Sequence, residues 1–423
     1  MREESYPKTA KLAIPFLLIL ICPPFSGCGK AQGSKNGLMH SSQIPVPARP
    51  GSGEPNLFSG EDGQLYLSWI EPAGTGRALR FSSLSQEAWS PPRTVAQGHN
   101  WFVNWADFPS LVAGKHRRLA AHWLVRSGAG HYAYDINISQ SFDAGRSWSR
   151  AVVPHRDGTE TEHGFVSLLP WPDGRLFAAW LDGRDFASPS NDHSRDNGAE
   201  PEMALRAAFL DEAGTVHHEQ VLDRRTCECC QTSAALTEAG AIVAYRDRSG
   251  SEVRDISVVR MVDGKWRPPA VLYPDGWKID GCPVNGPAVA AEGARVAIAW
   301  FTAAADTPRV KVVFSEDSGA TFSSPVVAND GETIGRVDVC LLPDGSAFVA
   351  WMESTRTAGM VLARRIFASG RKSDVLVLGQ TTASRASGFP QVASLGERVV
   401  VAWTETGEKA KVRTAVIAMS NVR

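Results

Sequence analysis

Leu176-Phe177-Ala178-Ala179-Trp180 is one of seven short apolar runs that end in an aromatic residue at nearly the same place in a repeat. The other copies are Leu65–Trp69, Leu119–Trp123, Ala241–Tyr245, Val296–Trp300, Ala347–Trp351 and Val399–Trp403. The aromatic residues lie about 51 to 65 residues apart, so one supersecondary unit is repeated. A period just above 50 with β-type composition is typical of propeller blades. The sequence therefore predicts an all-β fold, a β-propeller of four-stranded antiparallel blades, and the count of seven runs favours seven blades.

Each repeat contains the turn and strand signals of a four-stranded meander. In the third repeat, Phe165–Leu169 is expected to be the inner strand, and Glu202–Leu210 and Thr215–Leu222 the two outer strands. The turn Pro172-Asp173-Gly174 ends six residues before Trp180, and the same spacing recurs at Gly63 and Gly345. Equal spacing from turn to aromatic fixes the strand register, so the aromatic side chains are expected to fill the space between blades.

The last repeat stops after its third strand, Lys411–Met419. A ring must close its edges. We therefore expect Ser42–Pro47 to supply the missing outer strand, where prolines are tolerated. Six blades and an irregular extra hairpin remain the alternative.

Two segments between predicted strands share a second motif. They are Ser141-Phe142-Asp143-Ala144-Gly145-Arg146-Ser147-Trp148 and Ser315-Glu316-Asp317-Ser318-Gly319-Ala320-Thr321-Phe322. Both resemble the Asp box (BNR repeat) of the sialidase superfamily, in which an Asp carboxylate caps a turn and an aromatic packs between blades. The resemblance implies a sialidase-like propeller. Asp boxes are structural in that family and are shared by non-enzymes, so they indicate the fold and not an activity.

The N-terminal segment resembles the export signal of a bacterial lipoprotein. The apolar stretch Leu12–Cys22 has the length of a signal-peptide core, and Phe25-Ser26-Gly27-Cys28 resembles a lipobox. This implies a signal peptide over residues 1–27, lipidation of Cys28, a tether over 28–41 and one domain over 42–423. We expect the protein to be anchored to the cell envelope, at the outer membrane facing the periplasm or at the cell surface. Cleavage without lipidation is the alternative.

The charge is nearly balanced, with a formal net charge of −1. This excludes the strongly basic surface that nucleic-acid binding requires. No other long apolar run follows the signal, so contact with a membrane is expected through the lipid anchor only. The partner that we expect is a carbohydrate or a small acidic ligand, and the protein is expected to be a monomer.

Polar residues gather in the loops that enter the inner strands and in those between second and third strands. In a propeller these loops open on one face, here called the loop-rich face. Four residues are candidates for acid–base catalysis: Asp107, Glu162, His163 and Asp247. Six are candidates for substrate binding: Arg184, Arg246, Arg248, Arg336, Trp105 and Asn285. We expect Arg184, Arg246 and Arg336 to line one pocket at the axis with Glu162 and His163. The alternative is a set of Asp–Arg pairs that tie loops together.

The sialidase resemblance does not extend to a complete catalytic motif. Sialidases use three arginines, an Asp and a Tyr–Glu pair, and Tyr245 is the only candidate tyrosine found, at a structural aromatic position. The sequence therefore supports recognition of a glycan or acidic ligand, with hydrolysis as a further step if the protein is an enzyme.

Four cysteines enter neighbouring inner strands on the same face: Cys227, Cys229, Cys230 and Cys282. Disulfides such as Cys229 or Cys230 to Cys282 are one interpretation, given an exported protein. A copper or zinc site is the second, because thiolates suit both ions. A redox or nucleophilic thiol is the third. The second interpretation gives a rival function, a non-catalytic envelope protein that binds a metal or a protein partner. No other cofactor is expected. Cys340 is expected to be a buried free thiol.

Overall fold

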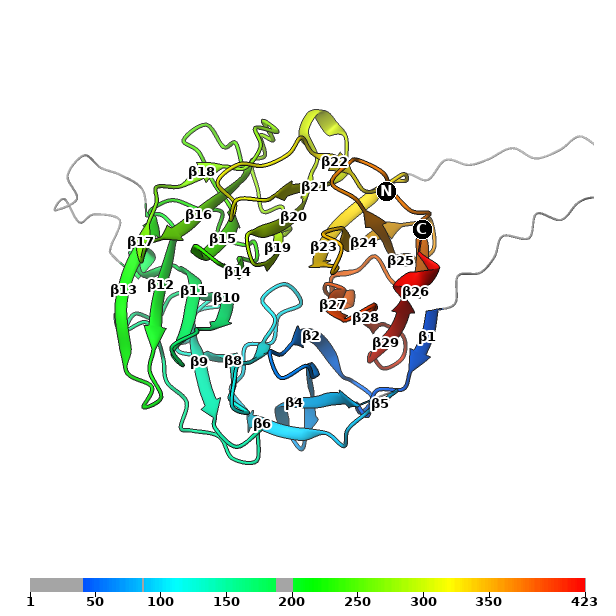
Figure 1. Cartoon of the computed structure of the whole chain (residues 1–423). Coiled ribbons are helices and arrows are strands. Elements are labelled where there is room, and N and C mark those ends of the chain that lie inside the picture. The colour runs from blue at the N-terminus through cyan, green and yellow to red at the C-terminus, as the bar shows by residue number, and fades with distance from the viewer. Residues whose placement is uncertain (1–40, 86, 188–200, 423) are drawn as a thin grey trace, which may run out of the picture. The chain divides into compact units, whose positions relative to one another are not determined.

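The computed structural model describes residues 41–85, 87–187 and 201–422, and these form a seven-bladed β-propeller (Figure 1). In the first six blades the antiparallel strands follow one another along the chain from the axis to the rim, and in the seventh the outermost strand comes from the N-terminal end of the described residues. The prediction of seven blades is confirmed.

The strands of the first three blades, from the axis outward, are β2 (Gly53–Ser59), β3 (Leu65–Ala73), β4 (Gly76–Ser85), β5 (Ala88–Trp89) and β6 (Arg93–Gly98); β7 (Ser110–Ala113), β8 (Leu119–Arg126) and β9 (Tyr134–Ser141); and β10 (His163–Pro170), β11 (Leu176–Asp182), β12 (Ala204–Leu210) and β13 (Val216–Asp223). Those of the fourth and fifth are β14 (Ser233–Thr237), β15 (Gly240–Arg246), β16 (Ile256–Val262), β17 (Lys265–Trp266) and β18 (Ala270–Val271); and β19 (Ala288–Glu292), β20 (Arg295–Thr302), β21 (Arg309–Ser315) and β22 (Val326–Val327). Those of the sixth and seventh are β23 (Thr333–Leu341), β24 (Ala347–Ser354), β25 (Gly359–Ile366) and β26 (Leu376–Thr381); and β27 (Gln391–Leu395), β28 (Arg398–Glu405), β29 (Lys411–Ala418) and β1 (Ser41–Ile44).

Four short 3-10 helices lie in the connections: η1 (Arg184–Ala187), η2 (Ala304–Asp306), η3 (Arg385–Ser387) and η4 (Met419–Asn421). None of the helices in the described part of the chain is long and apolar enough to cross a membrane.

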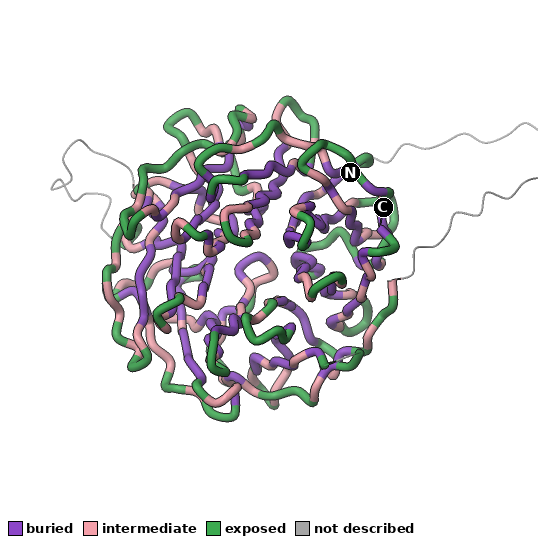
Figure 2. Tube along the Cα trace, viewed as in Figure 1, coloured by how far each residue is buried: buried purple, intermediate pink, exposed green. Residues whose placement is uncertain are grey.

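The repeated aromatic residues fill the blade core, as predicted. All seven have relative exposures of 7% or less: Trp69, Trp123, Trp180, Tyr245, Trp300, Trp351 and Trp403. Some also satisfy their indole N–H locally, since Trp180 donates to Asp182 (2.8 Å) and Trp351 to Glu353 (2.9 Å). Buried residues follow the strands of the blades, and exposed residues lie mainly in the connecting loops and at the rim (Figure 2).

The N-terminal strand closes the ring. Strand β1 pairs antiparallel with β29, from Ser41 opposite Ile417 to Ile44 opposite Thr414 (Figure 1). The Thr414 hydroxyl donates to the Ile44 carbonyl (2.8 Å) and accepts the indole N–H of Trp89 (3.0 Å), which joins the last blade to the first. The predicted closure is confirmed, with the strand ending before Pro45.

The two hairpins that resemble Asp boxes have the turn geometry that the motif requires. Asp143 Oδ1 accepts the backbone N–H groups of Arg146 and Ser147, both at 2.9 Å. The Ser147 hydroxyl donates to Asp143 Oδ2 (2.7 Å), and Gly145 adopts a positive φ of 77°. Asp317 makes the corresponding contacts in the second hairpin, where it accepts the Thr321 N–H (2.8 Å) and the Thr321 hydroxyl (2.7 Å).

Polar side chains near the axis link each blade to the next, and we call these contacts inter-blade latches. Six inner-strand or entry-loop residues and one hydroxyl pair make them: Asn56 to Leu111 N (3.1 Å), Asp107 to Phe165 N (2.7 Å), Ser167 to Thr232 (2.7 Å), Gln231 to Gly286 N (2.9 Å), Asn285 to Arg336 N (2.6 Å), Asp338 to Val392 N (2.7 Å) and Gln391 to Asn56 (3.2 Å). The latches satisfy a buried N–H group or side-chain amide at six blade boundaries and pair two hydroxyl groups at the seventh, and they thereby hold the inner strands in register.

Candidate functional site

A cavity of about 770 Å³ runs along the axis and is lined by the inner strands. Its lining includes Cys340 but none of the predicted catalytic residues, the predicted arginines or the four clustered cysteines. Near the loop-rich face the entry loop of the second blade reaches across the ring, where Trp105 stacks on Phe389 (centroids 5.8 Å apart) and the Ala106 carbonyl accepts the Gln231 amide (2.5 Å). Trp105 is therefore a packing residue, and the predicted axial pocket is not formed.

Arg246 and Arg336 do not converge on a ligand-sized space. Arg246 is 1% exposed, and its guanidinium donates to the carbonyls of Asn285, Arg254 and Phe301 at 2.6–2.9 Å. Arg336 donates to the carbonyls of Ser384 (2.9 Å) and Gly388 (3.2 Å) and lies over the Trp105 ring. The guanidinium groups of both arginines donate to backbone carbonyls of the protein itself. The prediction that these arginines line a ligand pocket is therefore wrong.

The other two predicted arginines form ion pairs within the chain. Arg184 donates to Asp182 through Nε (2.6 Å) and Nη2 (2.7 Å) and to Glu219 (2.8 Å). Arg248 pairs with Glu252 (2.9–3.1 Å) and Glu228. The alternative prediction of Asp–Arg pairs is confirmed for Asp182 and Arg184. For Arg248, the acids are glutamates and not the neighbouring Asp247.

The side chains of Asp247 and Asn285 form hydrogen bonds with backbone groups of neighbouring loops. Asp247 accepts the Arg248 N–H (2.7 Å) and the Ser257 hydroxyl (3.0 Å). Burial and the nearby Asp223 raise its pKa. Asn285 is a latch residue whose side-chain amide also donates to Pro283 (3.1 Å) and Ile334 (3.3 Å). Neither side chain has polar atoms left over for a substrate.

Two predicted catalytic carboxyl groups meet at a tyrosine that the sequence analysis missed. The hydroxyl of Tyr134, at the start of β9, lies 2.9 Å from Asp107 Oδ2 and 2.8 Å from Glu162 Oε1. Tyr134 is 1% exposed and stacks on Phe102 with centroids 4.0 Å apart. Asp107 is also buried, whereas Glu162 is partly exposed at the loop-rich face.

This triad must share protons. A phenol has one hydrogen to donate, so contact with both carboxyl groups requires a proton on one of them. Burial raises the pKa of Asp107 to about 8, with Glu162 adding to the shift. Burial likewise raises the pKa of Glu162 to about 7, and Glu228 contributes. The group can therefore hold and release a proton near neutrality.

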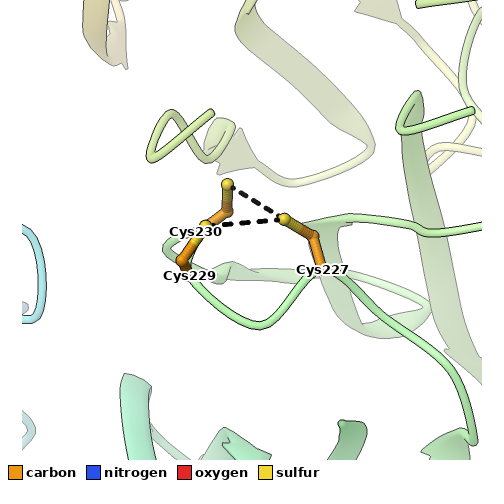
Figure 3. Close-up of side chains that lie close together, drawn as sticks. All are labelled: Cys227, Cys229 and Cys230. Atoms are coloured by element: carbon orange, nitrogen blue, oxygen red, sulfur yellow. Dashed lines mark hydrogen bonds between the residues drawn. The ribbon is translucent and has the colours of Figure 1, made fainter. Parts of the chain in front are cut away.

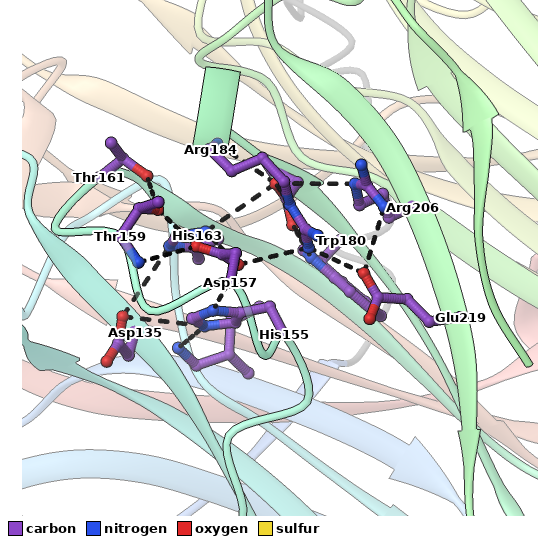
Figure 4. Close-up of polar contacts among 12 residues, drawn as sticks. Asp135, His155, Asp157, Thr159, Thr161, His163, Trp180, Arg184, Arg206 and Glu219 are labelled. Carbon is purple, nitrogen blue, oxygen red and sulfur yellow. Dashed lines mark hydrogen bonds and ion pairs between the residues drawn. The ribbon is translucent and has the colours of Figure 1, made fainter. Parts of the chain in front are cut away.

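His163 belongs to a different network between the second and third blades (Figure 4). It is fully buried and stacks on His155, with ring centroids 3.7 Å apart. His163 Nε2 lies 3.3 Å from Asp157 Oδ2, and its Nδ1 lies 3.8 Å from Asp135 Oδ1. The Ile136 N–H donates to His155 Nε2 (3.3 Å), so a neutral His155 carries its hydrogen on Nδ1, which faces Asp157.

The donor set of this network resembles that of a metal site, but a guanidinium already supplies the positive charge. Arg184 Nη2 lies 3.3 Å from Asp157 Oδ2 and donates to Asp182, while Arg206 pairs with Glu219 (3.2 Å) (Figure 4). Burial alone would raise the pKa of Asp157, but its contacts with His155 and His163 lower it. We therefore interpret the network as a structural set of ion pairs, and His163 does not face the Tyr134 hydroxyl.

The cysteines form the one ligand-type cluster of the described residues that is made of sulfur atoms alone. The sulfur atoms of Cys227, Cys229 and Cys230 all lie within 4.8 Å of one another, in the entry loop of the fourth blade (Figure 3). Cys227 Sγ is 3.8 Å from Cys229 Sγ and 3.5 Å from Cys230 Sγ. A tetrahedral ion with bonds of about 2.3 Å to sulfur separates its sulfur ligands by about 3.8 Å. The spacing fits a thiolate metal centre.

Donors around the cluster stabilise negative charge on sulfur. Arg254 Nη1 lies 3.2 Å from Cys227 Sγ, and the Asn285 N–H donates to Cys230 Sγ (3.4 Å). Hydrogen bonds from Cys229 and Cys230 lower the pKa of Cys227 well below its usual range. Arg254 is held in turn by Glu252 (2.9 Å) and Glu228 (3.4 Å). Cys227 is therefore prepared to act as a thiolate ligand.

The disulfide interpretation is not what the structure shows. All five described cysteines are free, and the Cys227 sulfur lies well beyond the disulfide bond length of about 2.05 Å from both neighbours. Cys282, from the entry loop of the fifth blade, is exposed and contacts Cys229. Cys340 is a buried free thiol, as predicted.

The sequence contains a signal for some of the structurally important residues that were not predicted, but not for all of them. The latch residues Asn56, Gln231, Asn285, Asp338 and Gln391 recur with the blade period, so an alignment of the repeats would have marked Asn285 as structural. Tyr134 starts the third strand of its blade, and Arg254 precedes the third strand of another. Nothing in the local sequence of either residue shows which side chains it contacts.

No family model and no curated protein matches the sequence. Among solved structures, the chain is similar to a variant of the NanB sialidase from Streptococcus pneumoniae, with 10% identity over 85% of this chain and 84% of that one and a TM-score of 0.48. It is also similar to a GH93 α-L-arabinofuranosidase of Fusarium graminearum in complex with arabinobiose (15% identity, 90% and 98% covered, TM-score 0.47). A third is a protein of unknown function from Dyadobacter fermentans (12% identity, 90% and 98% covered, TM-score 0.47). The similarities concern the propeller fold, and identities this low do not transfer an activity.

Proposed function

We propose that this protein binds one soft metal ion, Cu(I) or Zn(II), through the thiolates of Cys227, Cys229 and Cys230, with Cys282 as a fourth sulfur. The observation that carries the proposal is the 3.5–3.8 Å spacing of free sulfur atoms beside Arg254. Thiolate ligands select these ions over the hard cations that carboxylates prefer. The rigid blades on either side fix the site before the ion arrives.

The test is a competition titration with a chromogenic chelator, using full-length protein with Cys22→Ser and Cys28→Ser so that five cysteines remain. We expect one ion per chain. Cys227→Ser should weaken binding by about 100-fold or more, because it removes the most ionised ligand. Cys340→Ser is the matched control, since Cys340 is buried in another blade, and it should bind normally. Equal loss in both variants, or no binding at all, would refute the proposal.

A second candidate function, hydrolysis of a glycan or acidic ligand at the loop-rich face, is supported by one observation. Glu162 has a pKa of about 7 and contacts the Tyr134 hydroxyl, which is how a general base meets a nucleophile. In this proposal Glu162 takes the phenolic proton as the Tyr134 oxygen bonds to the anomeric carbon and the glycosidic bond breaks, and the leaving oxygen takes its proton from water. A chromogenic-glycoside screen tests it. Activity that Glu162→Gln lowers by about 100-fold or more would support it, and an inactive unmodified protein would contradict it.

The proposed location is the cell envelope, with Cys28 lipidated; residues 1–40 lie outside the described part of the chain. The support is the sequence of Leu12–Cys28 alone. Incorporation of labelled palmitate that Cys28→Ser abolishes would establish the anchor. Secretion of unlabelled protein would show cleavage without lipidation.

A further inference from the structure

The four clustered cysteines differ in how far they reach toward solvent. Cys227 and Cys230 are 0% and 1% exposed, Cys229 is partly exposed, and Cys282 is exposed. The first three belong to the entry loop of the fourth blade and Cys282 to that of the fifth. The sulfurs therefore form a path from the protein interior to solvent that crosses a blade boundary.

The loop that bears Cys282 is fixed at both ends. Before it, Lys278 forms a bridge with Val253, and the Ile279 N–H donates to the Glu252 carbonyl (3.1 Å). After it, the Asn285 N–H donates to Cys230 Sγ, and the Asn285 carbonyl accepts two bonds from Arg246 (2.9 and 2.7 Å). Between these anchors Asp280, Gly281 and Cys282 are exposed, so Cys282 stays within reach of Cys229 while facing solvent.

We propose that Cys282 is the exchange ligand through which the ion enters and leaves the buried thiolates, a proposal that rests on the proposed function. In release, an incoming thiol, thioether or chelator donor bonds to the ion as the Cys282–metal bond breaks. In uptake, the Cys282 sulfur bonds to the ion as the carrier's donor leaves it. The ion keeps its oxidation state, and any proton displaced from a thiol goes to solvent. Cys227 and Cys230 cannot meet such a donor because they are buried.

This role differs from that of a fourth stabilising ligand in a way that kinetics can measure. A stabilising ligand slows release, so its loss speeds release and weakens binding. An exchange ligand lowers the barrier in both directions, so its loss slows uptake and release together and leaves the affinity less changed.

The experiment follows stopped-flow transfer of Cu(I) to and from bicinchoninate, and of Zn(II) to and from pyridylazoresorcinol, with the full-length protein in the Cys22→Ser, Cys28→Ser background. We expect Cys282→Ser to slow uptake and release in parallel, each by about tenfold or more, with a smaller change in Kd. Cys340→Ser is the control and should leave both rates unchanged. Unchanged rates, or faster release, in Cys282→Ser would overturn the exchange role alone. Failure of the unmodified protein to take up either ion would overturn this inference together with the proposed function.

Discussion

The ion-pair network around Asp182 and the cysteine cluster at Cys227 are both dense in polar atoms, and both lie toward the loop-rich face. In the first, acids and bases neutralise one another: Arg184 satisfies Asp182 and Glu219, and Arg206 adds a second cation. In the second, three sulfurs of like character lie close together, Arg254 contacts the Cys227 sulfur, and Arg246 adds a second positive charge nearby. The comparison teaches that density of ionisable groups does not identify a binding site. A site also needs ligand atoms of one kind at the spacing that an ion requires, as the cysteine sulfurs have.

The largest effect is expected at Arg246, one of the four arginines that the sequence predicted to bind a ligand. Arg246→Lys keeps the charge and loses the planar fork that satisfies three buried carbonyls. Because an unsatisfied buried carbonyl costs about 1–3 kcal/mol, the free energy of unfolding should fall by about 2–5 kcal/mol. Urea unfolding measures it, with the exposed Arg150→Lys as the control. If Arg246→Lys had the same free energy of unfolding as the parent, the structural role would be wrong and Arg246 would again be a candidate for ligand binding.

A smaller effect is expected at Arg254, which positions charge beside the cluster. Arg254→Gln removes the cation 3.2 Å from Cys227 Sγ. Loss of a partner around the ligands should weaken metal affinity by about 10- to 100-fold. The Cys227 pKa rises without this cation, so the pH midpoint of binding should also move upward. A titration at several pH values checks both, and Arg248→Gln, which pairs with the same Glu228 but not with sulfur, is the matched control. An affinity loss without a shift of the midpoint would indicate only a packing change.

The smallest effect is expected at Asp107, and its sign is set by linkage. The pKa is about 8 in the folded protein and about 3.9 in an unfolded chain, so between these values the folded state binds more protons. The stability that this group contributes is present below about pH 4 and is lost as the pH rises through 8. Asp107→Asn keeps the latch acceptor for Phe165 and cannot ionise, so it should lose about 1 kcal/mol less stability than the parent between pH 7 and 8.5. Equal pH slopes in the two proteins would contradict this account, and exposed Asp280→Asn is the control.

Much of the fold was predictable because it repeats. The aromatic residues from Trp69 to Trp403 gave the blade number, and the short last repeat after Lys411 gave the closing strand at Ser41. The candidate site was predictable only where its residues are adjacent in sequence, as Cys227, Cys229 and Cys230 are. Contacts across blades were not: Tyr134 reaches Asp107 and Glu162 through tertiary packing, and Arg246 turns inward to carbonyls that carry no sequence signature.

The measurement that tests the central claim most directly is X-ray absorption at the metal edge of full-length protein, with Cys22→Ser and Cys28→Ser, loaded with one equivalent of Cu(I) or Zn(II). The account predicts a coordination shell of three or four sulfur atoms at about 2.3 Å, which Cys227→Ser disrupts and Cys340→Ser preserves. A shell of nitrogen and oxygen atoms, or an ion that stays free in solution, would contradict it.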